Sequence, residues 1–182
     1  FVSPQKDNGY DIADYKNIDP RFGTMEDLEE LIAEAKKRDI YLMFDMVLNH
    51  TSTDHIWFKK AMAGDEKYKN YYYFKKPKAD GSMPTNWESK FGGPCWEYVE
   101  KFDEYYLHLF DTSMADLNWS NPEVRKECLN IVQFWIDKGV KGFRFDVFNL
   151  TDKMAFVDDY EGVGKKYYTD GPKVHDYLRE IN

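Results

Sequence analysis

The sequence contains little cysteine, no long apolar run and no excess of basic residues. Cys95 and Cys128 are its two cysteines, too few and too far apart for a disulfide framework or a zinc site. We therefore expect free thiols, as in a protein of the reducing cytoplasm. No segment has the roughly 18 uninterrupted apolar residues that cross a bilayer, and no charged-then-apolar leader begins at Phe1, so we expect no membrane partner.

Positive charge is also scarce. Lys and Arg number 25 against 33 Asp and Glu, and the net charge of −8 argues against a nucleic-acid partner. Hydrophobic residues make up 42% of the chain and aromatic residues 18%, which is typical of a globular protein with a packed core. Aromatic faces pack on sugar rings as well as on one another, so this composition fits a carbohydrate partner and an ordinary core alike.

A unit of strand, helix and strand is predicted near the N-terminus. Phe1-Val2 reads as the tail of a strand, and Thr24 begins a capping box for a helix over about Met25–Arg38. The continuous apolar run Ile40–Phe44, which ends in Asp45, predicts a buried parallel strand. This order is typical of a βαβ unit, whose functional residues gather at the carboxyl ends of the strands.

The second half repeats this order after a long interruption. Residues Thr51–Ser113 are rich in aromatics, Gly and Pro, and one short helix is expected near Asp54–Ala63. The segment is far too long for an ordinary connection between a strand and a helix, so it predicts an inserted subdomain. Asn121-Pro122 begins a helix that ends at Gly139, and a buried strand follows over Val140–Val147. A long loop over residues 149–169 and a last helix starting near residues 170–172 complete the α/β pattern.

Polar residues follow each predicted strand, in the groups Asp7–Tyr15, Asp45–His50 and Arg144–Asn149. Arg144 and Asp146 are two positions apart, so on a strand their side chains leave the same face. Each group has a structural alternative, because Arg-x-Asp is often an ion pair beside a core and a lone histidine is often a satisfied core residue. Three groups at one edge favour a functional site.

Three of these segments resemble a known family. Asp45–His50 (DMVLNH), Gly142–Asp146 (GFRFD) and Met114–Asn118 (MADLN) resemble signature segments of the α-amylase superfamily of retaining glycoside hydrolases. The following Trp119–Pro122 is similar to the group of oligo-1,6-glucosidases, dextran glucosidases and trehalose-6-phosphate hydrolases. The segments that most resemble the last of these are residues 84–87, 89–93 and 168–172.

The resemblance implies a partial (β/α)8 TIM barrel, about strands 2 to 4, with a small subdomain inserted after the third strand. Residues 1–50 and 114–182 would be barrel parts, and 51–113 the subdomain. A retaining glycosidase needs a second carboxyl group, as acid and then base, roughly 5 Å from the nucleophile. The resemblance places this group beyond Asn182, so we expect residues 1–182 to be a piece of a longer enzyme and inactive alone.

The family's roles carry over to matching positions as implications of the resemblance. Asp146 matches the nucleophile, and Arg144 matches the arginine that keeps it ionised. His50 matches the histidine that binds glucose hydroxyls. The remaining matches are Asp45, which would support the site, Asp7 and Tyr10, which would close the glucose pocket, and Phe91 and Phe110, which would form its aromatic walls. Core packing is the alternative for Tyr10 and both phenylalanines.

Two positions bear on cofactor and substrate contacts. Asn49 lies where some amylases bind calcium; we expect no cofactor in this segment and leave calcium open for the full-length protein. Met114 stands where the group commonly has Gln, and a thioether lacks the amide's donors and acceptor.

The substrate implied is a small carbohydrate. Lys165 and Lys166 lie beside glycines in the loop after the nucleophile strand, where their two ammonium groups would bind the phosphate of trehalose 6-phosphate. Hydrolysis of this substrate would release glucose and glucose 6-phosphate. The alternative for both is solvated surface. Alternative functions are hydrolysis of neutral isomalto-oligosaccharides and a non-catalytic amylase-like domain, against which the intact Arg144 and Asp146 argue.

Overall fold

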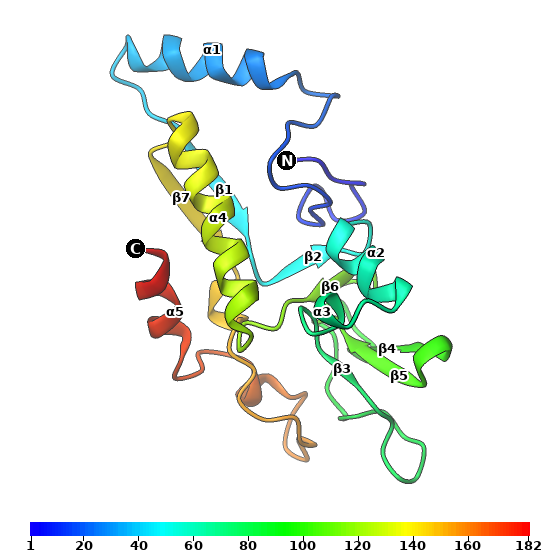
Figure 1. Cartoon of the computed structure of the whole chain (residues 1–182). Coiled ribbons are helices and arrows are strands. Elements are labelled where there is room, and N and C mark those ends of the chain that lie inside the picture. The colour runs from blue at the N-terminus through cyan, green and yellow to red at the C-terminus, as the bar shows by residue number, and fades with distance from the viewer.

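A computed structural model describes residues 1–182, and Figure 1 shows its course. The helices are α1 (Met25–Lys36), α2 (Ile56–Ala63), α3 (Glu66–Lys69), α4 (Pro122–Lys138) and α5 (Val174–Ile181), with short 3-10 helices η1 (Glu100–Phe102), η2 (Phe148–Leu150) and η3 (Lys165–Tyr167). The strands are β1 (Met43–Val47), β2 (His50–Ser52), β3 (Phe74–Lys75), β4 (Trp96–Val99), β5 (Glu104–Leu107), β6 (Met114–Asp116) and β7 (Gly142–Asp146).

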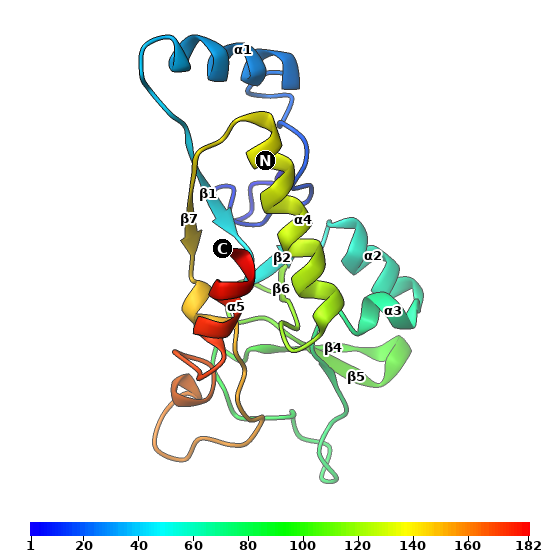
Figure 2. The ribbon, with the colours of Figure 1, turned by 60° about the vertical axis from the view of Figure 1, so that its left-hand side comes forward.

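Strands β1 and β7 lie side by side and parallel, with Asp45 opposite Arg144 and Val47 opposite Asp146. Helix α4 runs along this pair and leads directly into β7 (Figure 2). The whole inserted segment separates the two strands in sequence, yet they are neighbours in space. The expected α/β barrel fragment is confirmed, as two parallel strands and their helices rather than a closed barrel.

The strand predicted after the first helix was misplaced by three residues at each end. It runs over Met43–Val47 rather than Ile40–Phe44, because pairing with β7 begins at Met43. Ile40 is 56% exposed, so the apolar run was not a reliable guide to the buried segment. Asp45 therefore lies inside the strand, beside Arg144, and not after its end.

The strands are less buried than their sequences predicted. In β7 no residue is fully buried and Arg144 is exposed. The reason is that β1 and β7 form a sheet of two strands, so neither outer edge has a neighbour. The small Phe1-Val2 segment does not extend this sheet; Val2 makes an isolated antiparallel bridge with Asp14.

The helix boundaries agree with their capping residues. Thr24 and Asp27 form the predicted capping box of α1, which ends two residues before the predicted Arg38. Asn121 caps α4 through the Glu123 amide, and Gly139 ends it in the left-handed conformation. The last helix begins later than predicted, at Val174, and the Lys173 amide just before it donates to Asp152 at 2.9 Å.

The residues between β2 and β6 are those predicted to form the insertion, and they lie between β1 and β7 in the sequence. Its centre is the antiparallel sheet β3-β5-β4, and β2 pairs with β6 at its base (Figure 1). The division predicted at residues 50 and 113 thus falls on a pair of strands. One cluster of buried side chains joins the insertion to the barrel part, since Tyr72 and Trp135 both belong to it.

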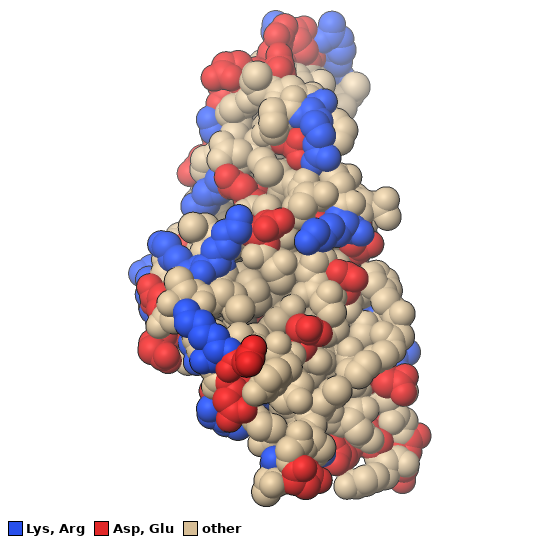
Figure 3. Space-filling view, turned by 90° about the vertical axis from the view of Figure 1, so that its right-hand side faces the viewer, with Lys and Arg blue, Asp and Glu red and all other residues tan.

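The surface mixes charges of both signs. On the face shown in Figure 3, lysines and arginines lie among acidic residues rather than in one continuous basic patch. None of the helices is long and apolar enough to cross a membrane.

Candidate active site

Arg144 joins two carboxylates at the carboxyl end of the parallel pair. Its Nη1 lies 2.6 Å from Asp45 Oδ2, and its Nη2 lies 2.7 Å from Asp146 Oδ1. The register places Asp45 directly across from Arg144, and the two-residue spacing brings Asp146 to the same face. The Asp45 hydrogen bond and the nearby Asp146 charge raise the pKa of Arg144, so the guanidinium stays charged.

The opposite face of β7 is apolar. Phe143 and Phe145 point into a hollow of about 640 Å³ that α4 and α5 also line. Arg144 and Asp146 do not line this hollow, so it does not belong to the carboxylate cluster. The alternation along β7 separates a packing face from a polar face.

A buried carboxylate organises the loop that carries Asp7 and Tyr10. Asp11 accepts hydrogen bonds from Ser3 Oγ at 2.8 Å, from the Lys6 amide at 2.9 Å and from the Asp7 amide at 3.2 Å. The loop thereby brings the Tyr10 hydroxyl to 3.2 Å from Asp45 Oδ2. Tyr10 thus contacts Asp45, and Asp7 lies on the same loop, where its carbonyl accepts from the Tyr10 amide at 2.9 Å.

His50 is buried beside this loop and its tautomer is fixed by its neighbours. The Lys153 ammonium can only donate, so the Asn49 Oδ1 that it contacts at 2.9 Å is the amide's acceptor end. Asn49 Nδ2 therefore donates to His50 Nδ1 at 3.1 Å, and His50 Nε2 carries the proton toward the Tyr10 carbonyl at 3.2 Å. Burial lowers the pKa of His50, which keeps the imidazole neutral near pH 7.

A buried lysine fills the position at which Asn49 suggested calcium. The side chains of Lys153 and Asp116 are both fully buried, with Lys153 Nζ 2.7 Å from Asp116 Oδ2. The same ammonium donates to Asn49 Oδ1 and to the Leu150 carbonyl at 2.6 Å. These oxygens already bind the Lys153 ammonium, so the residues around Asn49 do not fit an additional calcium ion.

The two predicted wall residues lie together next to His50. The ring of Phe110 is 5.1 Å from the His50 ring, and the Phe91 ring is 5.7 Å from Phe110. Phe91 is 60% exposed, which argues against the core alternative for this residue. Met114 is buried in β6 and takes part in packing.

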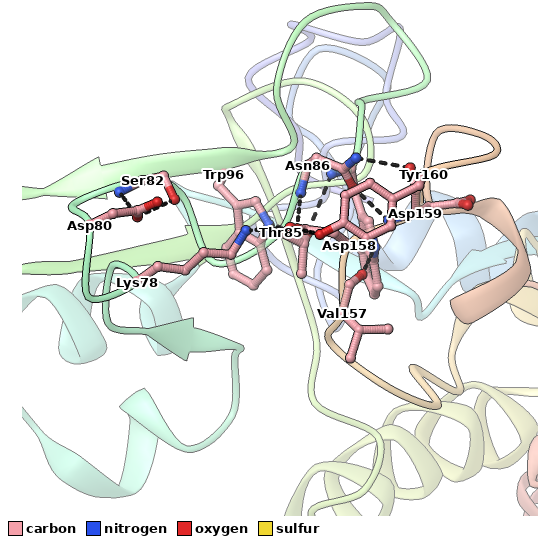
Figure 4. Close-up of polar contacts among 11 residues, drawn as sticks. Lys78, Asp80, Ser82, Thr85, Asn86, Trp96, Val157, Asp158, Asp159 and Tyr160 are labelled. Atoms are coloured by element: carbon pink, nitrogen blue, oxygen red, sulfur yellow. Dashed lines mark hydrogen bonds and ion pairs between the residues drawn. The ribbon is translucent and has the colours of Figure 1, made fainter.

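The loop that follows β7 is fastened to the inserted subdomain (Figure 4). Lys78 Nζ contacts both oxygens of Asp158, at 2.8 and 2.7 Å. Asn86 Nδ2 donates to the Asp159 carbonyl at 2.9 Å, and the Asp159 amide donates back to Asn86 Oδ1 at 2.8 Å. Trp87 Nε1 adds a bond to the Val157 carbonyl at 2.8 Å. We call this set of contacts the loop latch.

The loop latch gives the two predicted phosphate-binding lysines different environments. Lys166 is paired with Asp159 at 3.0 Å and with Glu161 at 3.2 Å, and both contacts raise its pKa. Lys165 begins η3 and belongs to no ion pair or side-chain hydrogen bond. Of the two, only Lys165 has an ammonium without an acidic partner.

Val147, directly after Asp146, has a backbone conformation that is rare for its residue type. Its φ of 44° and ψ of 30° lie in the left-handed region, which β-branched residues avoid. Here the chain turns from β7 into η2. Such strain is held in place by surrounding structure and concentrates at functional sites.

Sequence reasoning missed Asp11, Lys153 and Val147. A carboxylate between polar loop residues gives no sign that it binds three donors, and a lysine in a loop is typical of solvated surface. Asp116 lies inside the MADLN segment, so the sequence could have marked it as a candidate site residue. Its partner Lys153 lies 37 positions later and is close only in space.

Comparison with known proteins identifies the family. The family model described as "Alpha amylase, catalytic domain" matches residues 1–182. Trehalose-6-phosphate hydrolase of Bacillus subtilis is 55% identical over 184 residues, and oligo-1,6-glucosidase of Heyndrickxia coagulans is 46% identical over 190 residues. The match covers the whole of this chain in both cases, but 33% and 34% of those proteins.

Solved structures give the same result. The crystal structure of Bacillus licheniformis trehalose-6-phosphate hydrolase superposes with a TM-score of 0.97 at 52% identity, over 100% of this chain and 33% of that one. The chain thus spans about a third of the length of the relatives it matches. It belongs to the α-amylase family, as part of the catalytic domain.

Proposed function

We propose that the full-length protein is a retaining α-glucosidase that hydrolyses trehalose 6-phosphate to glucose and glucose 6-phosphate, with Asp146 as its nucleophile. The observation that carries the proposal is the bridge from Arg144 to Asp45 and Asp146, beside His50 and the Phe91–Phe110 wall. The similarity to trehalose-6-phosphate hydrolases supports the choice of substrate.

In this mechanism a carboxylate oxygen of Asp146 attacks the anomeric carbon, and the bond from that carbon to the leaving sugar's oxygen breaks. A second carboxyl group protonates the leaving oxygen and then activates the water that releases glucose. Asp45 is poorly placed for that role, because its Oδ2 already accepts from Arg144 and Tyr10. The resemblance to the family implies an acid/base glutamate outside residues 1–182.

The other polar residues bind and orient the glucose. In the proposed complex, neutral His50 shares its Nε2 proton between the Tyr10 carbonyl and a sugar hydroxyl, while Asp7 and Tyr10 limit the pocket to a terminal sugar. Arg144 fixes the direction of the Asp146 carboxylate through the 2.7 Å contact. No step requires a cofactor, and at Asn49 the Lys153 ammonium takes the place that a metal ion would have.

A cytoplasmic location completes the proposal. Cys95 and Cys128 are both free and buried, as expected for a reducing compartment. Burial raises the pKa of both thiols, so they remain protonated and unreactive.

Steady-state kinetics of the full-length enzyme test the proposal. We expect kcat/KM for trehalose 6-phosphate to exceed that for isomaltose by about 100-fold or more, as when a polar site recognises a group that the competitor lacks. Asp146→Asn should lower kcat by several orders of magnitude with both substrates. A preference for isomaltose would favour the second candidate, an oligo-1,6-glucosidase, which the 46% identity to such an enzyme supports.

A further inference from the structure

A single tyrosine hydroxyl holds both ends of the short segment that carries His50. Residues 47–50 lead from the last residue of β1 to the first of β2, and we call them the His50 segment. The Tyr15 hydroxyl lies 2.8 Å from the carbonyl oxygen of Val47, at the start of the segment, and 2.9 Å from that of His50, at its end. Because its one proton is shared between two acceptors, the hydroxyl fixes how far apart the two carbonyls lie.

Two further donors hold the middle of the His50 segment. Trp119 Nε1 donates to the Leu48 carbonyl at 2.7 Å, and the Leu117 amide donates to the Asn49 carbonyl at 2.9 Å. Four successive carbonyls are therefore each bound by a donor from another part of the chain. All four residues of the segment are buried, so the loss of a donor would leave a buried carbonyl unpaired, which is costly.

Tyr15 is itself held firmly in the core. Its ring packs against the rings of Phe1 and His55, with centroid distances of 6.1 and 5.5 Å. On α4, Trp135 Nε1 donates to the Tyr15 carbonyl at 2.8 Å. Burial raises the pKa of Tyr15, so the hydroxyl keeps its proton and remains a donor.

Both carbonyls that Tyr15 binds belong to residues beside the candidate site. Val47 lies directly across the parallel pair from Asp146, and His50 carries the imidazole that binds glucose in the proposed function. The side-chain contacts described above orient the His50 ring, whereas Tyr15 fixes the backbone from which the ring extends. A change in this spacing would move the imidazole relative to the nucleophile, and a displacement of about 1 Å can lower a rate about 100-fold.

We propose that Tyr15 is a positioning residue of this enzyme, which sets the place of His50 relative to Asp146 by holding the backbone between them. This rests on the proposed function, in which both residues act on glucose. Tyr15 contacts neither the substrate nor the reacting atoms and acts through His50. A tyrosine with a structural role alone would stabilise the fold and leave binding and turnover unchanged.

A double-mutant cycle of Tyr15→Phe and His50→Ala in the full-length enzyme tests this role. We expect kcat/KM for p-nitrophenyl α-glucoside to fall about 10- to 100-fold in Tyr15→Phe, because the imidazole is displaced. In the His50→Ala background the same change should cost less than about 2-fold, because the residue through which Tyr15 acts is gone. Chemical denaturation measures the stability of each variant alongside its kinetics.

Tyr106→Phe is the matched control. The Tyr106 hydroxyl also belongs to a buried tyrosine that donates to a backbone carbonyl, that of Thr112 at 2.6 Å, but it lies in the inserted subdomain. Its denaturation midpoint should fall as that of Tyr15→Phe does, while its kcat/KM should equal that of the wild type. If Tyr15→Phe does not fold, Trp119→Phe takes its place in the cycle, because it removes the donor to Leu48 in the same segment.

The outcomes separate this role from the proposed function. If the wild type prefers another substrate to trehalose 6-phosphate and the cycle is non-additive, the proposed substrate is wrong and the role of Tyr15 stands. If the wild type has no glucosidase activity, the cycle is measured by calorimetry of glucose binding, where Kd should rise in Tyr15→Phe only when His50 is present. Equal fold-losses for Tyr15→Phe in both backgrounds, or an equal loss in Tyr106→Phe, would overturn the positioning role.

Discussion

At the scale of single residues, the candidate site rests on two groups of charges with different surroundings. The Arg144 side chain is 54% exposed and contacts Asp45, inside β1, and Asp146, at the end of β7. Lys153 lies in the interior and holds Asp116 and Asn49. In our account the first group contacts the substrate, and the second fixes the orientation of His50 through Asn49.

Replacing Lys153 by Met tests the interior group. The change leaves the Asp116 carboxylate buried without its cation, so we expect the free energy of unfolding to fall by about 3–5 kcal/mol. Asn49 also loses the contact that fixes its orientation, so KM should rise through His50. Chemical denaturation of the full-length protein measures the first effect, and glucoside kinetics measure the second.

Lys126→Met on the surface of α4 provides the comparison and should stay within about 0.5 kcal/mol of the wild type. Adding Asp116→Asn to Lys153→Met removes the uncompensated charge and should recover part of the loss. A cost below about 1 kcal/mol for Lys153→Met would show that the buried pair does not have the role given to it here.

At the scale of elements, the loop latch is the feature that joins the nucleophile strand to the inserted subdomain. Gly164 lies so close to Trp87 that a Cβ at this position would come within 2.3 Å of the ring. Trp87 is in turn packed against Phe156, with stacked rings 5.4 Å apart. The close approach requires glycine, which also adopts the φ of 91° without strain.

Gly164→Ala should therefore loosen the latch. We expect a loss of about 1–3 kcal/mol from overpacking, in addition to about 1 kcal/mol from the positive φ. Gly81→Ala is the control, because Gly81 has a φ of 83° and open space around its Cβ position, so it carries the conformational cost alone. Equal losses of stability in the two variants would contradict the packing argument.

The sequence predicted some elements well for local reasons. The caps at Thr24 and Asn121 and the stop at Gly139 depend on neighbouring residues and were confirmed. The β1 boundaries were wrong because a strand is defined by its partner, and β7 lies about a hundred positions away. The latch was not predicted at all, since nothing local in Asp158 or Asp159 indicates Lys78 or Asn86 as partners.

At the scale of the whole molecule, the chain is a section of a catalytic domain. It spans about a third of its relatives and contributes two neighbouring parallel strands with the insertion between them. The apolar face of β7, with Phe143 and Phe145, opens on the hollow beside α5, and its polar face carries Arg144 and Asp146. Signature segments identified the family because they keep their spacing within each strand, whereas the contacts between segments needed the structure.

Covalent trapping of the full-length enzyme tests the central claim most directly. A 5-fluoro-α-glucosyl fluoride forms a glycosyl-enzyme that hydrolyses slowly, so the labelled peptide can be identified by mass spectrometry after proteolysis. The account predicts one glucosyl-derived adduct, on Asp146, that is absent in Asp146→Asn. An adduct on Asp45, or undiminished turnover without any adduct, would contradict it.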